Sequence, residues 1–220
     1  MIIDFKAHIM PGMDKTCKSR IDTIRRLMAA KDAGVDLIVA ALVYDPDEST
    51  VEEFLERREK SEDILASLMN EELPDVMPAA MVIYRDSLLT AEGLEKLCFG
   101  DKCFLLSMKD AEWDDTTEAV LRRLTGALGM KVILANAGEA VLKHGEKMQQ
   151  LGVHVLLDLD EIHHKKQIRA FLPFIANGLI SALGSDWESE RPYRFLRKAI
   201  RRMDAAFDTV MCASAKLLGK

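Results

Sequence analysis

The chain begins with a short apolar strand that passes directly into charged and polar residues: Ile2-Ile3-Asp4-Phe5-Lys6-Ala7-His8-Ile9-Met10-Pro11-Gly12-Met13-Asp14. α/β barrels and open α/β sheets keep their chemistry at the carboxyl ends of such strands. Alternate strand residues point the same way, so the pattern Asp-x-His-x-His at this place is typical of a metal site. Here a lysine, Lys6, stands where the first histidine of that pattern would be.

Six further apolar runs predict strands that are buried on both faces of a parallel sheet, at residues 36–43, 76–83, 103–108, 131–135, 153–158 and 179–184. Apolar residues at helical spacing predict helices between them, at 21–33, from Ser49 or Thr50 to about 68, 88–97, 116–128, 141–151 and 165–177. The chain is predicted to close with a helix from 191 to about 207 and a last short helix through 218.

Seven strands that alternate with helices indicate repeated βα units in one domain over residues 1–220. We predict an α/β fold of the TIM-barrel-like type, a distorted (β/α)7 barrel, in preference to an open sheet. Periodicity alone does not separate these two architectures. No glycine-rich phosphate loop follows any predicted strand, which disfavours a nucleotide-binding protein.

Composition narrows the class of protein further. The formal net charge of −6 gives no electrostatic reason to bind nucleic acid or an anionic membrane. No apolar run approaches the roughly 20 residues of a membrane span, and the N-terminus lacks the basic and small-residue features of a signal peptide. The four cysteines have no CxxC spacing. We therefore expect a cytoplasmic protein with reduced thiols.

Polar side chains follow every predicted strand and would form a ring at one end of a barrel. They are Lys6, His8, Asp14, Tyr44, Asp45, Tyr84, Arg85, Lys109, Asp110, Asn136, Glu139, Asp158, Asp160, Asp186 and Glu188. Strand-end loops are polar in most proteins, so any one of these residues taken alone is more often solvated than functional. The opening stretch and Ser185-Asp186-Trp187-Glu188 give the strongest signal. A carboxylate after the last strand, facing a histidine from the first, is what hydrolytic metal barrels require.

Residues 8–14 resemble the His-x-His-Ile-Leu-Pro-Gly-x-Asp-Asp-Gly opening of the bacterial polymerase-and-histidinol-phosphatase (PHP) superfamily. Within it, the chain is most similar to the manganese-dependent protein-tyrosine phosphatases of capsule and exopolysaccharide operons (CpsB/YwqE-like). Further similar segments are residues 79–84, 100–108, Ser185-Asp186 and Arg191-Pro192. The resemblance implies a distorted seven-stranded barrel, a metal-dependent phosphatase, and a tyrosine kinase of polysaccharide export as a partner.

The departures from the family pattern fall on its metal ligands. The paired histidines of the opening correspond to Lys6, which cannot ligate while protonated, and to His8, which can. Other ligand positions of the family correspond to Lys15, Val43, Tyr44, Met81 and Asn136, and its final Asp-x-His corresponds to Asp186-x-Glu188. The family's phosphate-facing arginine falls near Glu139. A polynuclear site is not expected from such a donor set.

The resemblance and the residues together give a candidate site. Remaining metal donors are His8, Asp14, Asp186 and Glu188, sufficient at most for one divalent cation, Mn, Mg or Fe. Lys6, Asn136 and Asp186 are the remnant of the catalytic centre, and Arg85 and Arg191 are the candidate substrate-binding residues. Lys6 is predicted to pair with Asp186, because a buried carboxylate without a counter-charge is costly.

Three hypotheses about function remain open at this stage. The first is a divergent PHP-type phosphatase homologue with an eroded metal site that is catalytically weak or inactive, a pseudoenzyme. The second is an active hydrolase with a mononuclear site at His8, Asp186 and Glu188. The third is an amidohydrolase-like barrel, which Gly184-Ser185-Asp186-Trp187 also resembles, although the rest of that class's binuclear centre is missing. The sequence leaves the substrate and any homo-oligomer undetermined.

Overall fold

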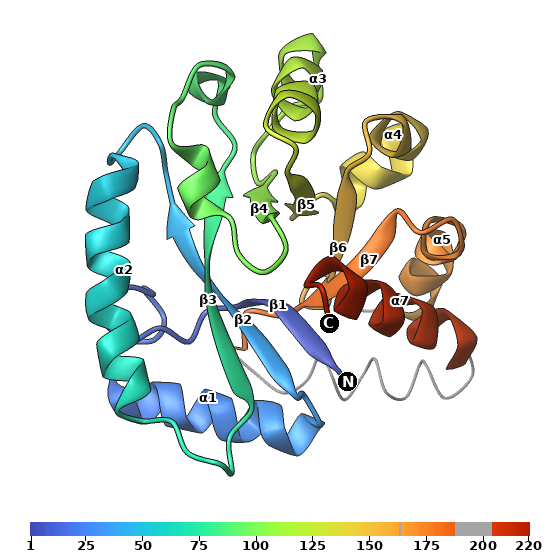
Figure 1. Cartoon of the computed structure of the whole chain (residues 1–220). Helices are drawn as coiled ribbons and strands as arrows, with labels where there is room; N and C mark the ends of the chain where they lie inside the picture. The colour runs from blue at the N-terminus through green and yellow to red at the C-terminus, as the bar shows by residue number, and fades with distance from the viewer. Residues whose placement is uncertain (163, 188–203) are drawn as a thin grey trace.

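The computed structural model describes residues 1–162, 164–187 and 204–220. In these parts of the chain one sheet contains seven parallel strands in chain order, namely β1 (Ile3–Ala7), β2 (Leu37–Tyr44), β3 (Asp75–Ile83), β4 (Cys103–Ser107), β5 (Lys131–Ala135), β6 (His154–Asp158) and β7 (Ile180–Gly184). An open doubly wound sheet reverses its strand order at a switch point, and this sheet does not. The strands nearly close into a barrel (Figure 1), so the predicted fold class is confirmed.

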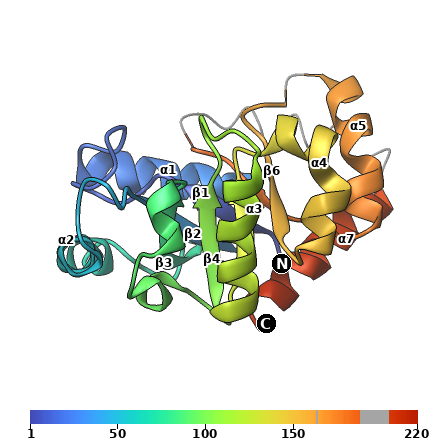
Figure 2. The same ribbon diagram turned by 90° about the horizontal axis from the view of Figure 1, so that it is seen from above.

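Helices surround the strands on the outside, as both views show (Figures 1 and 2). They are α1 (Arg20–Ala33), α2 (Val51–Ala66), α3 (Asp115–Arg122), α4 (Gly138–Gln150), α5 (Lys165–Ala176) and α7 (Asp204–Leu217). Thr50, one of two predicted caps, begins α2 with a capping box shared with Glu53. Gly34 ends α1 at φ 84°, a left-handed conformation that glycine adopts without a Cβ clash.

Two predicted helices differ from the structure. Residues 88–97 form two short 3-10 helices, η1 (Asp86–Leu89) and η2 (Leu94–Leu97), because Gly93 at φ 73° interrupts the chain between them. α7 runs unbroken through Phe207, so the predicted helix boundary there is wrong. Residues 191–203 of the predicted helix lie outside the described residues. None of the described helices is both long enough and apolar enough to cross a membrane.

Strand alternation divides the buried residues into two layers. The outer layer packs between strands and helices and includes Ile38, Leu42, Val82 and Leu134. The inner layer fills the barrel and includes Ile3, Phe5, Val39, Ala79, Cys103, Leu105, Ile133, Leu156 and Ala182. Full burial of such a Leu, Ile or Phe side chain contributes about 1.5–3 kcal/mol relative to exposure. The barrel interior is thus a packed core and not a channel.

α7 closes the amino end of the barrel. Its C-terminal Leu217 and the following Leu218 belong to the inner apolar layer. The thiol of Cys103, at the start of β4, donates to the Leu217 carbonyl at 3.1 Å, and Ser214 Oγ donates to the Ser181 carbonyl at 3.0 Å. The amino end is therefore sealed by apolar side chains, and polar chemistry is left to the carboxyl end.

Candidate functional site

A β-bulge in β1 sets the position of the candidate site. Ile3 and Asp4 pair with Leu37 and Ile38, but the next paired residue is Ala7, with Ala40. One extra residue is therefore accommodated in β1 between Asp4 and Ala7, and the alternation of inward and outward residues shifts there. Phe5 belongs to the inner apolar layer, and the adjacent Lys6 also reaches across the barrel.

Asp4 joins the first and last strands. Its fully buried carboxylate accepts hydrogen bonds from the Lys6 backbone N–H at 2.8 Å, the Ser185 N–H at 3.2 Å and Trp187 Nε1 at 2.8 Å. β1 and β7 are not joined by ladder hydrogen bonds in the described residues, so this side chain supplies contacts across the seam. A carboxylate that accepts several N–H bonds is stabilised in its charged form.

Lys6 is the centre of a buried ion cluster at the carboxyl end of the barrel. Only 3% of it is exposed, and its ammonium contacts Asp158 Oδ2 and lies 2.8 Å from Asp186 Oδ1. Burial alone would lower the pKa of Lys6, but the two carboxylates outweigh it and raise the pKa above its ordinary value of 10.5. Lys6 therefore carries a fixed positive charge at neutral pH. The predicted pairing of Lys6 with Asp186 is confirmed.

Asp158, the last residue of β6, is the main partner of Lys6. Its Oδ2 also accepts a hydrogen bond from Asn136 Nδ2 at 3.1 Å, and Asn136 Oδ1 accepts one from Ser107 Oγ at 3.0 Å. Burial raises the pKa of Asp158 to about 6, and the charge of Lys6 offsets only part of that effect. Asp158 is therefore ionised at pH 7 and above.

His8 lies between two carboxylates at the edge of the cluster. Its Nδ1 is 3.2 Å from Asp14 Oδ1, and its Nε2 is 3.5 Å from Asp186 Oδ1. Asp14 is fixed in turn by the Met10 N–H, which donates to Oδ2 at 2.7 Å. Burial opposes protonation of His8, but the hydrogen bond and charge of Asp14, with the charge of Asp186, raise its pKa above the ordinary 6.5.

Asp160 positions the loop that carries Asp186. The Asp186 N–H donates to Asp160 Oδ2 at 2.6 Å, and Ser185 Oγ donates to Asp160 Oδ1 at 3.3 Å. The sequence placed Asp158 and Asp160 in the ring of strand-end residues but not in the candidate site, and it assigned no role to Asp4. The position of Asp158 at the end of a buried strand was the available signal, yet its contact with Lys6 depends on how the barrel closes.

The other predicted substrate-binding and metal residues are placed less centrally. Arg85 is held at the rim by Asp45 at 2.5 Å and Asp47 at 3.4 Å, so its guanidinium is already paired with carboxylates outside the Lys6 cluster. Arg191 and Glu188 lie outside the described residues.

The described part of this cluster is a poor set of donors for a divalent cation. Asp186 Oδ1 is buried and accepts no well-oriented hydrogen bond, but its two close neighbours are Lys6 Nζ and His8 Nε2, both of which carry or attract a proton. An ion bound to Asp158 and Asp186 would meet the Lys6 ammonium at contact distance. In residues 1–162, 164–187 and 204–220, no three His, Cys, Asp or Glu side chains gather as metal ligands.

A comparison with known proteins shows that this architecture occurs in another protein of known structure. No protein-family model matches the chain, and no curated protein matches its sequence. A solved structure matches with a TM-score of 0.72 over 98% of this chain and 94% of the other. It belongs to work on YwqE from Bacillus subtilis and CpsB from Streptococcus pneumoniae, described as unique metal-dependent tyrosine phosphatases. The chain shares their fold. Sequence identity is 14%, so the similarity establishes the architecture and not the chemistry.

Proposed function

We propose that the protein is a divergent PHP-type phosphatase homologue in which a lysine-centred ion cluster has replaced metal chemistry, and that it acts by binding and not by phosphoester hydrolysis. The observation that carries this proposal is the position of Lys6 between Asp158 and Asp186. A fixed ammonium neutralises the carboxylates that a metal ion would otherwise neutralise. It supplies neither an open coordination position nor a bound water of lowered pKa.

The electrostatics of the rim support the same proposal. A phosphate monoester is a dianion at neutral pH, and binding it requires cations that are free to contact it. Lys6 is paired with two carboxylates and Arg85 with two others. By analogy with the phosphatase family that the sequence resembles, the proposed partner is a tyrosine kinase of bacterial polysaccharide export. The proposed location is the cytoplasm, and the proposed binding unit is a single barrel domain. Binding of such a partner does not require turnover.

Metal content and turnover test this proposal directly. Protein purified without chelator should contain no stoichiometric Mn, Fe or Mg by mass spectrometry, and it should not hydrolyse p-nitrophenyl phosphate with added manganese. Lys6→His restores an imidazole donor beside His8, so this variant should gain measurable manganese affinity over wild type. Near-stoichiometric metal in the wild-type protein, with turnover that is lost in His8→Ala, would overturn the proposal.

The second candidate is a hydrolase with one metal ion held by His8, Asp186 and Glu188. The 3.5 Å separation of His8 Nε2 and Asp186 Oδ1 favours it, because two donors at that distance can share one ion once His8 is deprotonated. Turnover that appears only above the raised pKa of His8 and requires Glu188 distinguishes this candidate.

A further inference from the structure

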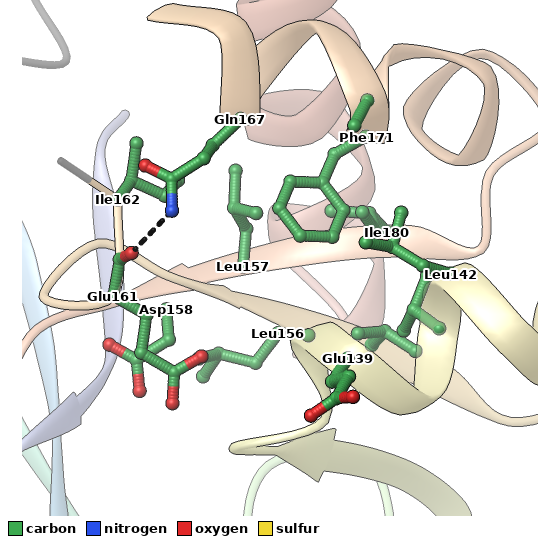
Figure 3. Close-up of a pocket in the computed structure, with 14 residues that line it drawn as sticks. Glu139, Leu142, Leu156, Leu157, Asp158, Glu161, Ile162, Gln167, Phe171 and Ile180 are labelled. Carbon is green, nitrogen blue, oxygen red and sulfur yellow. Dashed lines mark hydrogen bonds between the residues drawn. The ribbon is translucent and has the colours of Figure 1, made fainter. Parts of the chain in front are cut away.

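A cavity of about 240 Å³ lies beside the ion cluster, between α4, β6 and α5 (Figure 3). Its walls are mainly apolar and are formed by Val141, Leu142, Val155, Leu157, Phe171 and Ile180. Its polar groups are Glu139, Asp158, Glu161 and Gln167. An apolar pocket with a few convergent polar groups is the usual form of a small-molecule site.

The cavity lies beside the part of β6 that follows the end of its ladder with β5. Along these strands the ladder pairs Ile133 with His154 and Leu134 with Val155, and no further pair is formed in the described residues. Both Leu156, from the inner layer, and Leu157, from the outer layer, line the cavity. Neighbouring residues of a strand point to opposite faces, so a space that touches both lies at the open edge of β6.

Gly138, the first residue of α4, shapes the polar end of the cavity. A Cβ at this position would lie 3.2 Å from Glu161 Oε2 and 3.6 Å from Phe171 Cζ. The missing side chain therefore lets a carboxylate and an aromatic ring edge approach the same point. Figure 3 shows Asp158 and Glu161 together at one end of the cavity and Phe171, Ile180 and Leu142 toward the other.

The charged residues that line the cavity are all acidic. No Lys, Arg or His is among the residues that line it. Asp158 is neutralised by Lys6, and Glu139 pairs with Lys143 at 2.6 Å on the exposed side of α4. None of the ion pairs within the described parts of the chain involves Glu161. Glu161, an exposed residue at the end of this apolar space, therefore offers a carboxylate that no cationic side chain of the described residues occupies.

We propose that this cavity binds a small organic cation, a primary amine carried on one aromatic ring or a short alkyl chain. The ammonium group pairs with Glu161, and the apolar part packs against Phe171 and Leu157. An apolar cavity of about 150 Å³ holds a benzene molecule, so the space here accommodates one ring with a short substituent. An anionic ligand such as a phosphate ester is repelled. The site is independent of the proposed loss of metal chemistry.

Three ligands of one shape test the charge preference. Benzylamine, benzyl alcohol and benzoate are titrated into the full-length protein at pH 7 and followed by ligand-observed NMR and calorimetry. We expect benzylamine to bind with a dissociation constant on the order of 1 mM, about tenfold more tightly than benzyl alcohol, and benzoate not to bind. Equal binding of all three, or binding of none, overturns the proposal.

Two variants locate the site. Glu161→Gln removes the charge with little change of shape and should reduce benzylamine affinity about tenfold, to that of benzyl alcohol. Glu146→Gln, an equal charge change at an exposed α4 residue that does not line the cavity, should leave it unchanged. Gly138→Ala places a methyl group at the polar end and should weaken both ligands without unfolding the protein, because alanine favours a helix. Unchanged benzylamine binding in both Glu161→Gln and Gly138→Ala would refute the assignment, whatever the metal and turnover assays give.

Discussion

The two ends of the barrel contain the same strands but are closed by opposite means. At the amino end, Leu217 and Leu218 fill the space between strands with apolar side chains. At the carboxyl end, Lys6 and Asp158 fill it with charges that are equally buried, and the partly exposed Asp186 completes the cluster. Apolar closure contributes to stability directly, whereas charged closure must first offset the desolvation of every ion. The residues of the charged end are therefore not explained by stability alone.

Removal of the Lys6 ammonium should produce the largest loss in the free energy of unfolding. Lys6→Met leaves Asp158 and Asp186 without their cation, and breaking a buried pair in this way costs about 3–5 kcal/mol. Urea unfolding at pH 8 measures the loss. The loss should be smaller at pH 5, because Asp158, whose pKa is raised to about 6, becomes neutral and needs no counter-charge.

The matched control for Lys6 lies at the opposite end of the barrel. The partly exposed Lys131 pairs with the exposed Asp101 at 2.5 Å, so Lys131→Met should change stability far less. If Lys6→Met and Lys131→Met lowered the free energy of unfolding equally, the buried Lys6 cluster would contribute no more to stability than an exposed ion pair.

Truncation of a leucine side chain at the apolar amino end should produce the next largest loss of stability. Leu217→Ala removes buried methyl groups from the amino-end plug and should destabilise the protein by about 2 kcal/mol, with no dependence on pH between 5 and 8. Unfolding measured at both pH values checks this. A pH-dependent loss would contradict the separation of an apolar end from a charged end.

Adding a side chain to Gly184, where β7 packs closely against Lys6, should reduce the stability of the fold moderately. A Cβ on Gly184 would lie 2.7 Å from Lys6 Cβ and 2.9 Å from Leu156 Cδ1, so Gly184→Ala must displace β1 or β6. We expect a cost of about 1–3 kcal/mol. Gly126→Ala is the control, because a Cβ there meets no atom within 4 Å. Thermal unfolding of both variants decides whether the Lys6 side of the barrel is tightly packed.

The smallest effects on the free energy of unfolding should come from two histidines, His8 and His154, whose pKa values are shifted in opposite directions. The folded-state pKa of His8 is raised, so protonated His8 stabilises the fold below pH 6.5, and this contribution is lost as pH rises through the folded pKa. Burial, with the charge of Lys131, lowers the pKa of His154 at the amino end. The unfolded state then takes up a proton more readily, so stability falls as pH drops below 6.5.

Imidazole NMR titration measures both pKa values in the folded protein. The stability profiles of His8→Gln and His154→Gln should lose the alkaline and the acidic slope respectively. Shifts of the same sign at both histidines would contradict the contrast between the two ends.

Most of the architecture could be predicted from the sequence because strands buried on both faces appear as continuous apolar runs. The run at 131–135 coincides with β5, and the other predicted strands match within a few residues. The helix predicted at 88–97 failed because Gly93 adopts a left-handed conformation that helical spacing does not reveal. The candidate site was predicted in part: Lys6, His8, Asp14, Asn136 and Asp186 do lie together.

The sequence by itself determined the repeated βα units, the strand ends that carry polar residues and the presence of a lysine where a metal-binding pattern would have a histidine. Only the tertiary structure decided that Asp158 is the main partner of Lys6, that Asp4 joins β1 to β7, and that a cavity opens beside β6. These features depend on a bulge in β1, on the closure of the barrel and on how α4 and α5 pack beside β6. Each is a relation between different elements of the fold, and local periodicity carries no information about such relations.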